Sequence, residues 1–219
     1  MTQEHHIQTT RTARYYSLGS VEGEIKQLWF VLHGYGQRAE DLLNKFLPIA
    51  NQDTLIIAPE ALSRFYVKGF AGEVGASWMT REDRVNEIQD YVRYLDNLYS
   101  EVLIMLKKPP EKIIAFGYSQ GCPAVLRWQA GGNSPANEIV IWSGDVPRDL
   151  AFAKFKANTE KARKWMVYSP TDEFITPAIY KETQDLYLSN QIPFQQMMFE
   201  GGHRIPDTAL KEFRSKIEK

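Results

Sequence analysis

The stretch "IIAFGYSQGCPAVLRW" (residues 113–128) constrains the fold more than any other part of the chain. An apolar run typical of a buried strand leads into Gly-x-Ser-x-Gly, and the residues that follow have a helix-like pattern. A serine in so tight a turn between a strand and a helix adopts a strained backbone conformation, with little room for side chains two positions away. Glycine at 117 and 121 removes that crowding, so we expect Ser119 to expose its hydroxyl above the strand.

Strand and helix signals alternate from about residue 25 to the C-terminus. Short apolar runs that end at turn-forming residues predict strands covered on both faces. Segments with apolar residues at helical spacing lie between them, and Thr80 and Thr176 are the expected N-caps of two helices. The alternation predicts an open, mostly parallel α/β sheet in a single domain (1–219), with an antiparallel hairpin region at the sheet edge (1–24). The predicted strands are 25–34, 53–61, 112–119, 138–144, 164–170 and 194–202.

The composition argues against several classes of partner. The 26 basic and 27 acidic side chains give a net charge of −1, so no overall field favours nucleic acid or an anionic membrane. Cys122 is the only cysteine, which excludes an intrachain disulfide and gives no sign of an oxidising compartment. The N-terminal stretch lacks the apolar core of a signal peptide, and no apolar run is long enough to span a bilayer. We therefore expect a cytoplasmic protein without stable membrane insertion.

A serine hydroxyl needs a base to take its proton, and the presence of only four histidines allows an elimination. His5 and His6 lie in a polar N-terminal stretch, and His33 precedes Ser119 in the chain. Hydrolases that place a serine at this kind of turn carry their triad in the order serine, acid, histidine, which only His203 fits. His203 is the predicted base, and we expect His33 to hold a loop through hydrogen bonds.

The acid is expected after a strand that lies between the serine and the histidine. Asp172 in "VYSPTDEF" and Asp145 in "WSGDVP" both qualify, with Glu173 as a further alternative. Asp172 is favoured because it lies in the usual loop for this architecture. The oxyanion formed during attack needs two donors already in place. We expect the backbone N–H groups of Gln120, directly after the serine, and of Tyr35, in the glycine turn "HGYG".

The segment "SRFYVKGFAGEVGASWMTRED" (63–83) is a long connection after a predicted strand. Long connections in compact domains are often functional, and aromatic rings between glycines suit a flexible apolar wall beside an acyl group. We expect a shallow cleft that takes small to medium acyl groups better than long lipid chains; the alternative is that the rings only pack onto the core. The aromatic residues concerned are Phe65, Tyr66, Phe70 and Trp78.

These stretches together resemble the phospholipase/carboxylesterase family of α/β-hydrolases, to which acyl-protein thioesterases and many bacterial esterases belong. The resemblance runs from about Leu28 to the C-terminus through "FVLHGYG", "APEA", "FGYSQG", "WSGDVP", "YSPTDEFI" and "GGHRIP". It implies an α/β-hydrolase fold, a triad of Ser119, Asp172 and His203, and oxyanion donors at the positions already named. The connection 145–164 is too short to form a large cap domain.

Two positions depart from the family pattern. Gln37 stands where an Asp usually follows the glycine turn, and Ser169-Pro170 stands where His-Gly often precedes the acid. Both concern loop support, so the predicted function remains hydrolysis of a small-molecule ester or thioester through an acyl-enzyme, without a cofactor or a metal. The alternatives are a Cys122 nucleophile, a small peptidase of the same fold, and a non-catalytic ligand-binding protein on a hydrolase scaffold. Because Cys122 lies three residues after Ser119, inside the first turn of a helix, we expect its thiol to be buried.

Overall fold

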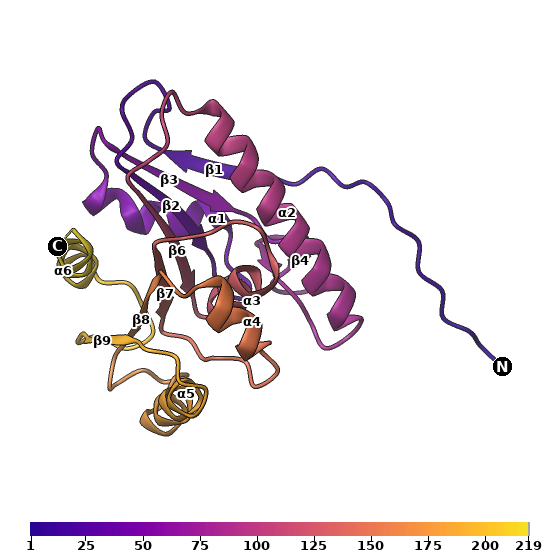
Figure 1. Ribbon diagram of the computed structural model, residues 1–219. Coiled ribbons are helices and arrows are strands. Elements are labelled where there is room, and N and C mark those ends of the chain that lie inside the picture. The colour runs from indigo at the N-terminus through magenta and orange to yellow at the C-terminus, as the bar shows by residue number, and fades with distance from the viewer. Residues whose placement is uncertain (219) are drawn as a thin grey trace.

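The computed structural model describes residues 1–218, and its centre is a seven-stranded sheet in the order β1-β3-β2-β6-β7-β8-β9 (Figure 1). Neighbouring strands are parallel except for β1, which runs antiparallel to β3 at one edge. This is the α/β-hydrolase architecture predicted from the sequence. The strands are β1 (Tyr15–Leu18), β2 (Gln27–Leu32), β3 (Thr54–Pro59), β6 (Lys112–Tyr118), β7 (Glu138–Trp142), β8 (Arg163–Tyr168) and β9 (Gln195–Met198).

Helices cover both faces of this sheet, and each face has its own apolar cluster. The helices α2 (Arg84–Met105), α3 (Gly121–Gly131), α4 (Phe152–Asn158) and α5 (Pro177–Ser189) contribute to one cluster. The helices α1 (Ala39–Leu43), η1 (Asn44–Ile49, a 3-10 helix) and α6 (Asp207–Ile217) contribute to the other. Parallel strands with helices on both faces are typical of α/β folds, because each crossover places a helix against the sheet.

The sequence of strand β2 is apolar after its first residue and does not alternate between apolar and polar residues, because both of its faces are buried. Successive side chains of a strand point to opposite faces, and both faces are covered here. Phe30 stacks on Tyr99 and meets the edge of Trp128 on one face, at centroid distances of 5.4 and 5.6 Å. Trp29 packs on Phe213 on the other face, with centroids 6.2 Å apart. The sheet is therefore fixed from both sides, and its carboxyl edge is a rigid platform.

The N-terminal hairpin expected from the sequence is not formed. Strand β1 is an antiparallel edge strand, as predicted, but it pairs with β3 and not with its chain neighbour β2. Strand β2 already pairs with β3 on one side and with β6 on the other, so its backbone has no free edge. Residues 1–14 lie in no helix or strand, and the N-terminal part of this segment extends away from the sheet (Figure 1).

The two predicted N-caps have different outcomes. Thr176 caps α5 by accepting a hydrogen bond from the N–H of Ile179 over 3.4 Å, as predicted. Thr80 does not cap α2, which begins at Arg84 after Asp83 in a left-handed conformation with φ of 47°. The backbone N–H of Thr80 donates instead to the Glu87 carboxylate over 2.6 Å. A carboxylate from the first turn of α2 thus accepts a backbone N–H of the loop that precedes the helix.

The long connection 63–83 has more regular structure than the sequence predicted. Residues Ser63–Tyr66 (β4) and Val74–Ser77 (β5) pair as a separate two-stranded antiparallel sheet. Glycine at position 75 allows this hairpin to lie directly against the backbone of Gly36, where a Cβ would collide. The hairpin therefore packs on the loop that follows β2.

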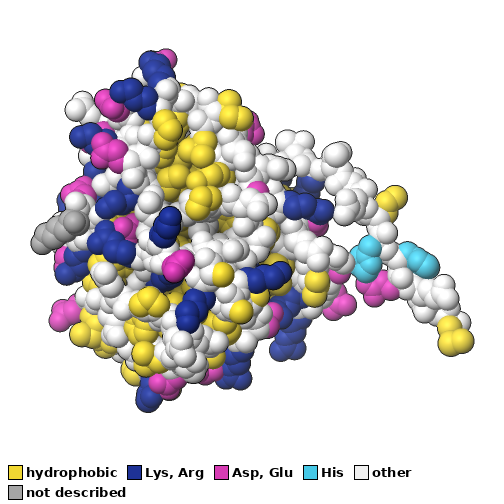
Figure 2. All heavy atoms as spheres, in the orientation of Figure 1, with side chains coloured by type: hydrophobic (Ala, Val, Ile, Leu, Met, Phe, Trp, Pro, Cys, Tyr) yellow, Lys and Arg dark blue, Asp and Glu magenta, His cyan; other side chains and the backbone are white. Residues whose placement is uncertain are grey.

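The face of the molecule shown in Figure 2 has no large region of a single charge sign. Figure 2 shows Lys and Arg side chains interspersed with Asp and Glu, as a net charge of −1 leads one to expect. Across residues 1–218, none of the helices combines the length and the apolarity needed to cross a membrane.

Candidate active site

Ser119 lies in the turn between β6 and α3 with a positive φ of 52°, which is rare for a residue with a side chain. A Cβ at Gly117 would collide with the backbone of Gly121, and a Cβ at Gly121 would collide with the carbonyl group of Leu32. The backbone is therefore strained at the serine and crowded two positions on either side, as the sequence predicted. Such strain persists only where the surrounding structure enforces it.

Asp172 and His203 form a hydrogen-bonded pair at the carboxyl edge of the same sheet. The Nδ1 atom of His203 lies 3.0 and 2.9 Å from the two carboxylate oxygens of Asp172. The backbone N–H groups of Phe174 and Ile175 also donate to this carboxylate, each over 2.9 Å. Burial of Asp172 disfavours its charge, but the Ile175 N–H and His203 outweigh burial and lower the pKa of the carboxyl group. An ionised Asp172 can therefore orient the imidazole.

Two aromatic side chains hold the His203 loop beside the serine turn. The hydroxyl of Tyr118, the residue before Ser119, donates to the carbonyl oxygen of His203 over 2.8 Å. The ring of Phe174 meets the His203 imidazole edge-on at 4.8 Å. In the described chain, residues 1–218, no hydrogen bond joins the Ser119 hydroxyl to His203. In enzymes without substrate this contact is often long, and it tightens when substrate binds.

The alternative acids occupy other positions. Asp145 is exposed at the end of β7 and makes no ion pair within residues 1–218, whereas Asp172 pairs with the imidazole. The Glu173 carboxylate accepts the backbone N–H of His203 over 3.1 Å, so it holds the loop rather than the ring. Of the three acids considered from the sequence, Asp172 is thus the one that the structure brings to the His203 ring.

Cys122 is fully buried in the first turn of α3. Its thiol donates to the carbonyl oxygen of Gly117 over 3.0 Å, on the inner side of the turn. Burial raises the pKa of this thiol well above its usual value, so the nucleophilic thiolate is disfavoured. The environment is that of a small buried apolar residue.

The backbone amides of Tyr35 and Gln120 differ from their neighbours. In the loop after β2, the N–H groups of Gly34, Gly36 and Gln37 all donate to protein acceptors. The N–H groups of Tyr35 and Gln120 donate to no protein atom within residues 1–218. Donors left free beside a strained serine are suited to an oxyanion. The Gln37 side chain accepts the Gly34 N–H over 3.1 Å, so it supplies loop support where the family usually has an Asp.

His33 holds the loop after β2 in place through two hydrogen bonds of its ring. Its Nε2 accepts the backbone N–H of Ala61 over 3.0 Å, so the ring proton is on Nδ1, which donates to the carbonyl oxygen of Gly34 over 2.7 Å. Burial lowers the pKa of His33 to about 4, so the ring is neutral at physiological pH. This is the loop-holding role that the sequence predicted for His33.

The side chain of Gln120 links the serine turn to the segment 77–79. Its amide oxygen accepts the backbone N–H of Trp78 over 3.2 Å, and its amide nitrogen donates to the carbonyl oxygen of Met79 over 3.0 Å. On the acid side, the Ser169 hydroxyl accepts the N–H of Gly202 over 3.1 Å. The sequence analysis expected loop support at Gln37 and Ser169, but it missed the contacts of the Gln120 and Tyr118 side chains because nothing local in the sequence marks them.

The four aromatic residues expected to form a pocket wall do not gather in one place. Trp78 is buried, and it lines a pocket of about 610 Å³ that also involves Gln120. Phe65 lies against the ring of Tyr35, and Tyr66 is half exposed on β4. Phe70 is 98% exposed at the tip of the β4–β5 hairpin. Phe65, Tyr66 and Phe70 are not among the residues that line this pocket.

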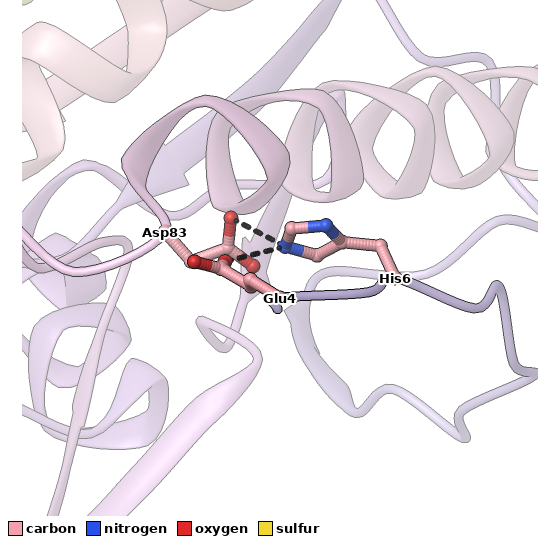
Figure 3. Close-up of side chains that lie close together, drawn as sticks. All are labelled: Glu4, His6 and Asp83. Carbon is pink, nitrogen blue, oxygen red and sulfur yellow. Dashed lines mark ion pairs between the residues drawn. The ribbon is translucent and has the colours of Figure 1, made fainter. Parts of the chain in front are cut away.

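One group of side chains has the spacing of a metal site, but it lies in another part of the chain (Figure 3). Glu4, His6 and Asp83 offer ligand atoms within 4.8 Å of one another, and all three are exposed. The His6 imidazole lies 3.1 Å from the Glu4 carboxylate and 3.3 Å from that of Asp83, so ion pairs already account for the cluster when His6 is protonated. This cluster could not be predicted from the sequence, because Asp83 is distant in the chain from Glu4 and His6.

Comparisons with known proteins agree with this fold. The chain matches the family described as Phospholipase/Carboxylesterase over residues 17–219. A solved structure of esterase PE8 has 21% sequence identity and a TM-score of 0.72, covering 95% of this chain and 99% of that chain. A carboxylesterase from Mesorhizobium loti has 17% identity and a TM-score of 0.74, covering 94% of each chain. Acyl-protein thioesterase 2 from Zea mays has 17% identity and a TM-score of 0.68, covering 94% and 98%. No match is found among curated proteins.

Proposed function

The chain belongs to the phospholipase/carboxylesterase family, and on that premise we propose that it cleaves carboxylic esters or thioesters of small to medium acyl groups with a Ser119–His203–Asp172 triad. The family membership makes the protein a carboxylesterase/thioesterase-type hydrolase. The proposal goes further by assigning the catalytic residues, the size of the acyl group and the mechanism. Its substrate is a small molecule, and no cofactor takes part in the steps below.

One observation carries the proposal. The strained turn at Ser119 and the Asp172–His203 pair lie at the carboxyl ends of strands in the same sheet, where α/β folds bind ligands. A strained backbone and a buried ionised carboxylate each reduce stability unless the surrounding structure supports them. A purely structural role does not require both of them beside an imidazole. Their coincidence supports acyl transfer.

In the first step, His203 Nε2 takes the proton of the Ser119 hydroxyl while Oγ attacks the carbonyl carbon of the substrate. Asp172 keeps the proton of the ring on Nδ1 and stabilises the imidazolium that forms. The negative charge that develops on the carbonyl oxygen is accepted by the N–H groups of Tyr35 and Gln120. These donors need no rearrangement, because neither makes a competing bond to the protein.

The tetrahedral intermediate collapses when His203 gives its proton to the leaving oxygen or sulfur. An alcohol or thiol departs and the acyl group remains on Ser119 as an ester. Water then attacks this ester with His203 again as base, and the acid is released with the serine restored. The same residues serve both halves, so ester and thioester substrates differ only in the leaving group.

Two other functions make different predictions. A non-catalytic binding protein on this scaffold would retain the pocket without a reactive serine, and a small peptidase would cleave amides as well as esters. Labelling with a fluorophosphonate probe, which bonds to activated serines, separates an enzyme from the binding protein, and activity on a matched amide separates the peptidase from the esterase. We expect labelling of the wild type and none of Ser119→Ala, together with loss of esterase activity by several orders of magnitude in kcat. A folded Ser119→Ala variant with normal turnover, or a wild type inert to the probe, would overturn the proposal.

A further inference from the structure

One face of α3 forms the floor of the pocket of about 610 Å³ beside the serine turn. Gln120, Pro123, Ala124 and Arg127 line this pocket, and their spacing of three and four positions puts them on one side of the helix. The short side chains of Pro123 and Ala124 leave the middle of the floor apolar. At its far end Arg127 supplies a cation, two turns along the helix from the proposed oxyanion residue.

Apolar side chains come from two walls of the pocket. One wall comes from the segment after β5, and the other comes from the connection after β7 and from α5. Such a lining suits a hydrocarbon chain and gives no reason for a guanidinium at the end of the pocket. The apolar wall residues are Trp78, Met79, Val146, Pro147, Ile179 and Leu186.

The guanidinium of Arg127 has unused hydrogen-bonding capacity. Its side chain is only 9% exposed, and its Nε has no hydrogen-bond partner within residues 1–218. One terminal nitrogen contacts the Met79 sulfur over 3.4 Å, which is a weak acceptor, and the other donates to Asp149 over 2.9 Å. A buried cation normally has more acceptors than this. The terminal nitrogen beside Met79 can therefore donate to a further anionic partner.

The charges around Arg127 are also unbalanced. Arg84 lies 2.7 Å from the same Asp149 carboxylate, so two cations share one anion at this end of the pocket. Arg148 and Glu182 neutralise each other at 2.6 Å. The remaining lining charge is on Asp145, which follows Gly144, and Gly144 lies against the backbone of Ser119. The pocket is thus negative near the serine turn and positive at its far end.

The position of the pocket relative to His203 decides which part of a substrate it would hold. The leaving group must lie close to His203, which protonates it, and His203 does not line this pocket. Gln120, the proposed oxyanion donor, does line it. The pocket therefore lies on the acyl side of the scissile bond, a step that rests on the proposed function.

We propose that this pocket binds the acyl group of the substrate and that Arg127, supported by Arg84, recognises a carboxylate at the far end of that group. Arg127 lies six positions after Gly121, which corresponds to about 9 Å along a helix with a rise of 1.5 Å per residue. The preferred substrates are monoesters or monothioesters of dicarboxylic acids whose two carbonyl carbons are separated by about that distance. Uncharged acyl groups of equal length bind less well.

The test uses p-nitrophenyl esters of dicarboxylic acids of increasing length, with the second carboxyl group either free or capped as its methyl ester. We expect the wild type to show a higher kcat/KM for the free acid than for the capped ester, with the ratio largest at one intermediate length. Arg127→Met lowers kcat/KM for the free acids by about tenfold to a hundredfold, mostly through KM, because hydrogen bonds to a charged group are lost. The capped esters lose less, because they have no charged group to bond to Arg127, so the ratio of free acid to capped ester falls.

The matched control is Arg93→Met, which also removes an arginine paired with an aspartate but on the exposed face of α2. It leaves the ratio unchanged. Competition gives a second measurement that needs no variant: dicarboxylic acids inhibit the wild type more strongly than monocarboxylic acids of equal length.

Three results would count against the proposal. A wild type that cleaves capped esters but favours the free acid at no length overturns it and leaves the proposed function standing. Equal losses on both series in Arg127→Met, without stronger inhibition by dicarboxylic acids, make Arg127 a structural partner of Asp149. A wild type inactive on every ester overturns the proposed function and this inference together.

Discussion

Trp78 donates a hydrogen bond from its indole Nε1 to the carbonyl oxygen of His33 over 2.8 Å, and the two rings lie 5.2 Å apart. The chain continues from His33 into the turn that carries the amide of Tyr35. Trp78 also contributes its backbone N–H to the side chain of Gln120. A residue expected from the sequence to form a pocket wall therefore also braces both proposed oxyanion donors.

Trp78→Phe tests this bracing role, because phenylalanine keeps an aromatic ring and loses the indole N–H. We expect kcat to fall by up to about a hundredfold for acetyl and hexanoyl esters alike, since a displaced oxyanion donor weakens every transition state. KM should change by less than about twofold for both esters. Steady-state kinetics on the two esters separate the effect on kcat from the effect on KM. A raised KM with normal kcat would make Trp78 a substrate contact only.

Asp172→Asn and Asp145→Asn compare the two aspartates that the sequence left open. Asparagine at 172 can donate to Nδ1 of His203, which favours the wrong tautomer facing the serine, and a loss of about 10⁴ in kcat is expected from the corresponding change in trypsin-like enzymes. Asp145 makes no hydrogen bond or ion pair with His203, so its variant should retain kcat on uncharged esters within about twofold. Kinetics with a p-nitrophenyl ester rank the two. The opposite order would move the acid to Asp145.

The strained turn at Ser119 could be predicted because its requirements are local. Gly117 and Gly121 are adjacent in sequence to the residue that they accommodate, and the strand before and the helix after have their own apolar patterns. His203 could be selected because so few histidines are available and chain order excludes the others. The mostly parallel sheet could be predicted from the same patterns, because strands that alternate with helices favour parallel pairing, whereas the order of the strands was not predicted.

Contacts between distant segments could not be predicted in this way. Strand β1 pairs with β3 because β2 has no free edge, which depends on the complete sheet. The Gln37 side chain replaces an expected acid through a hydrogen bond to Gly34 whose geometry depends on the loop. The pairing of His6 with Asp83 joins two segments without any shared pattern in the sequence. Such contacts depend on packing rather than on propensity.

Alkylation tests the remaining nucleophile. Cys122 is fully buried, and burial raises the pKa of its thiol. An alkylating reagent therefore cannot reach the sulfur, and little of the reactive thiolate is present. We expect iodoacetamide at pH 8 to leave the native enzyme unmodified and fully active, and to modify one thiol after unfolding in urea. Mass spectrometry of both samples measures the modification. Rapid inactivation of the native enzyme, with Cys122 modified, would restore the cysteine mechanism.

His33 makes the stability of the protein depend on pH. Its Nε2 accepts the N–H of Ala61, so a second ring proton would face another donor in a buried site. The pKa of His33 is about 4 in the folded protein, against an ordinary value of 6.5. Between these two pH values the unfolded chain binds a proton that the folded chain does not bind. The contribution of His33 to stability is thus complete above pH 6.5 and decreases as the pH falls towards 4.

Urea unfolding of the wild type and of His33→Gln at pH 7 and pH 4.5 isolates this contribution, because the carboxylates titrate alike in both proteins. At 1.36 kcal/mol per pKa unit, the free energy of unfolding of the wild type should fall by roughly 2 to 3 kcal/mol more than that of the variant. The variant should be less stable at pH 7, since glutamine does not reproduce both imidazole hydrogen bonds. If both proteins lose the same stability on acidification, His33 is protonated in the folded state and the neutral loop-holding tautomer assigned here is wrong.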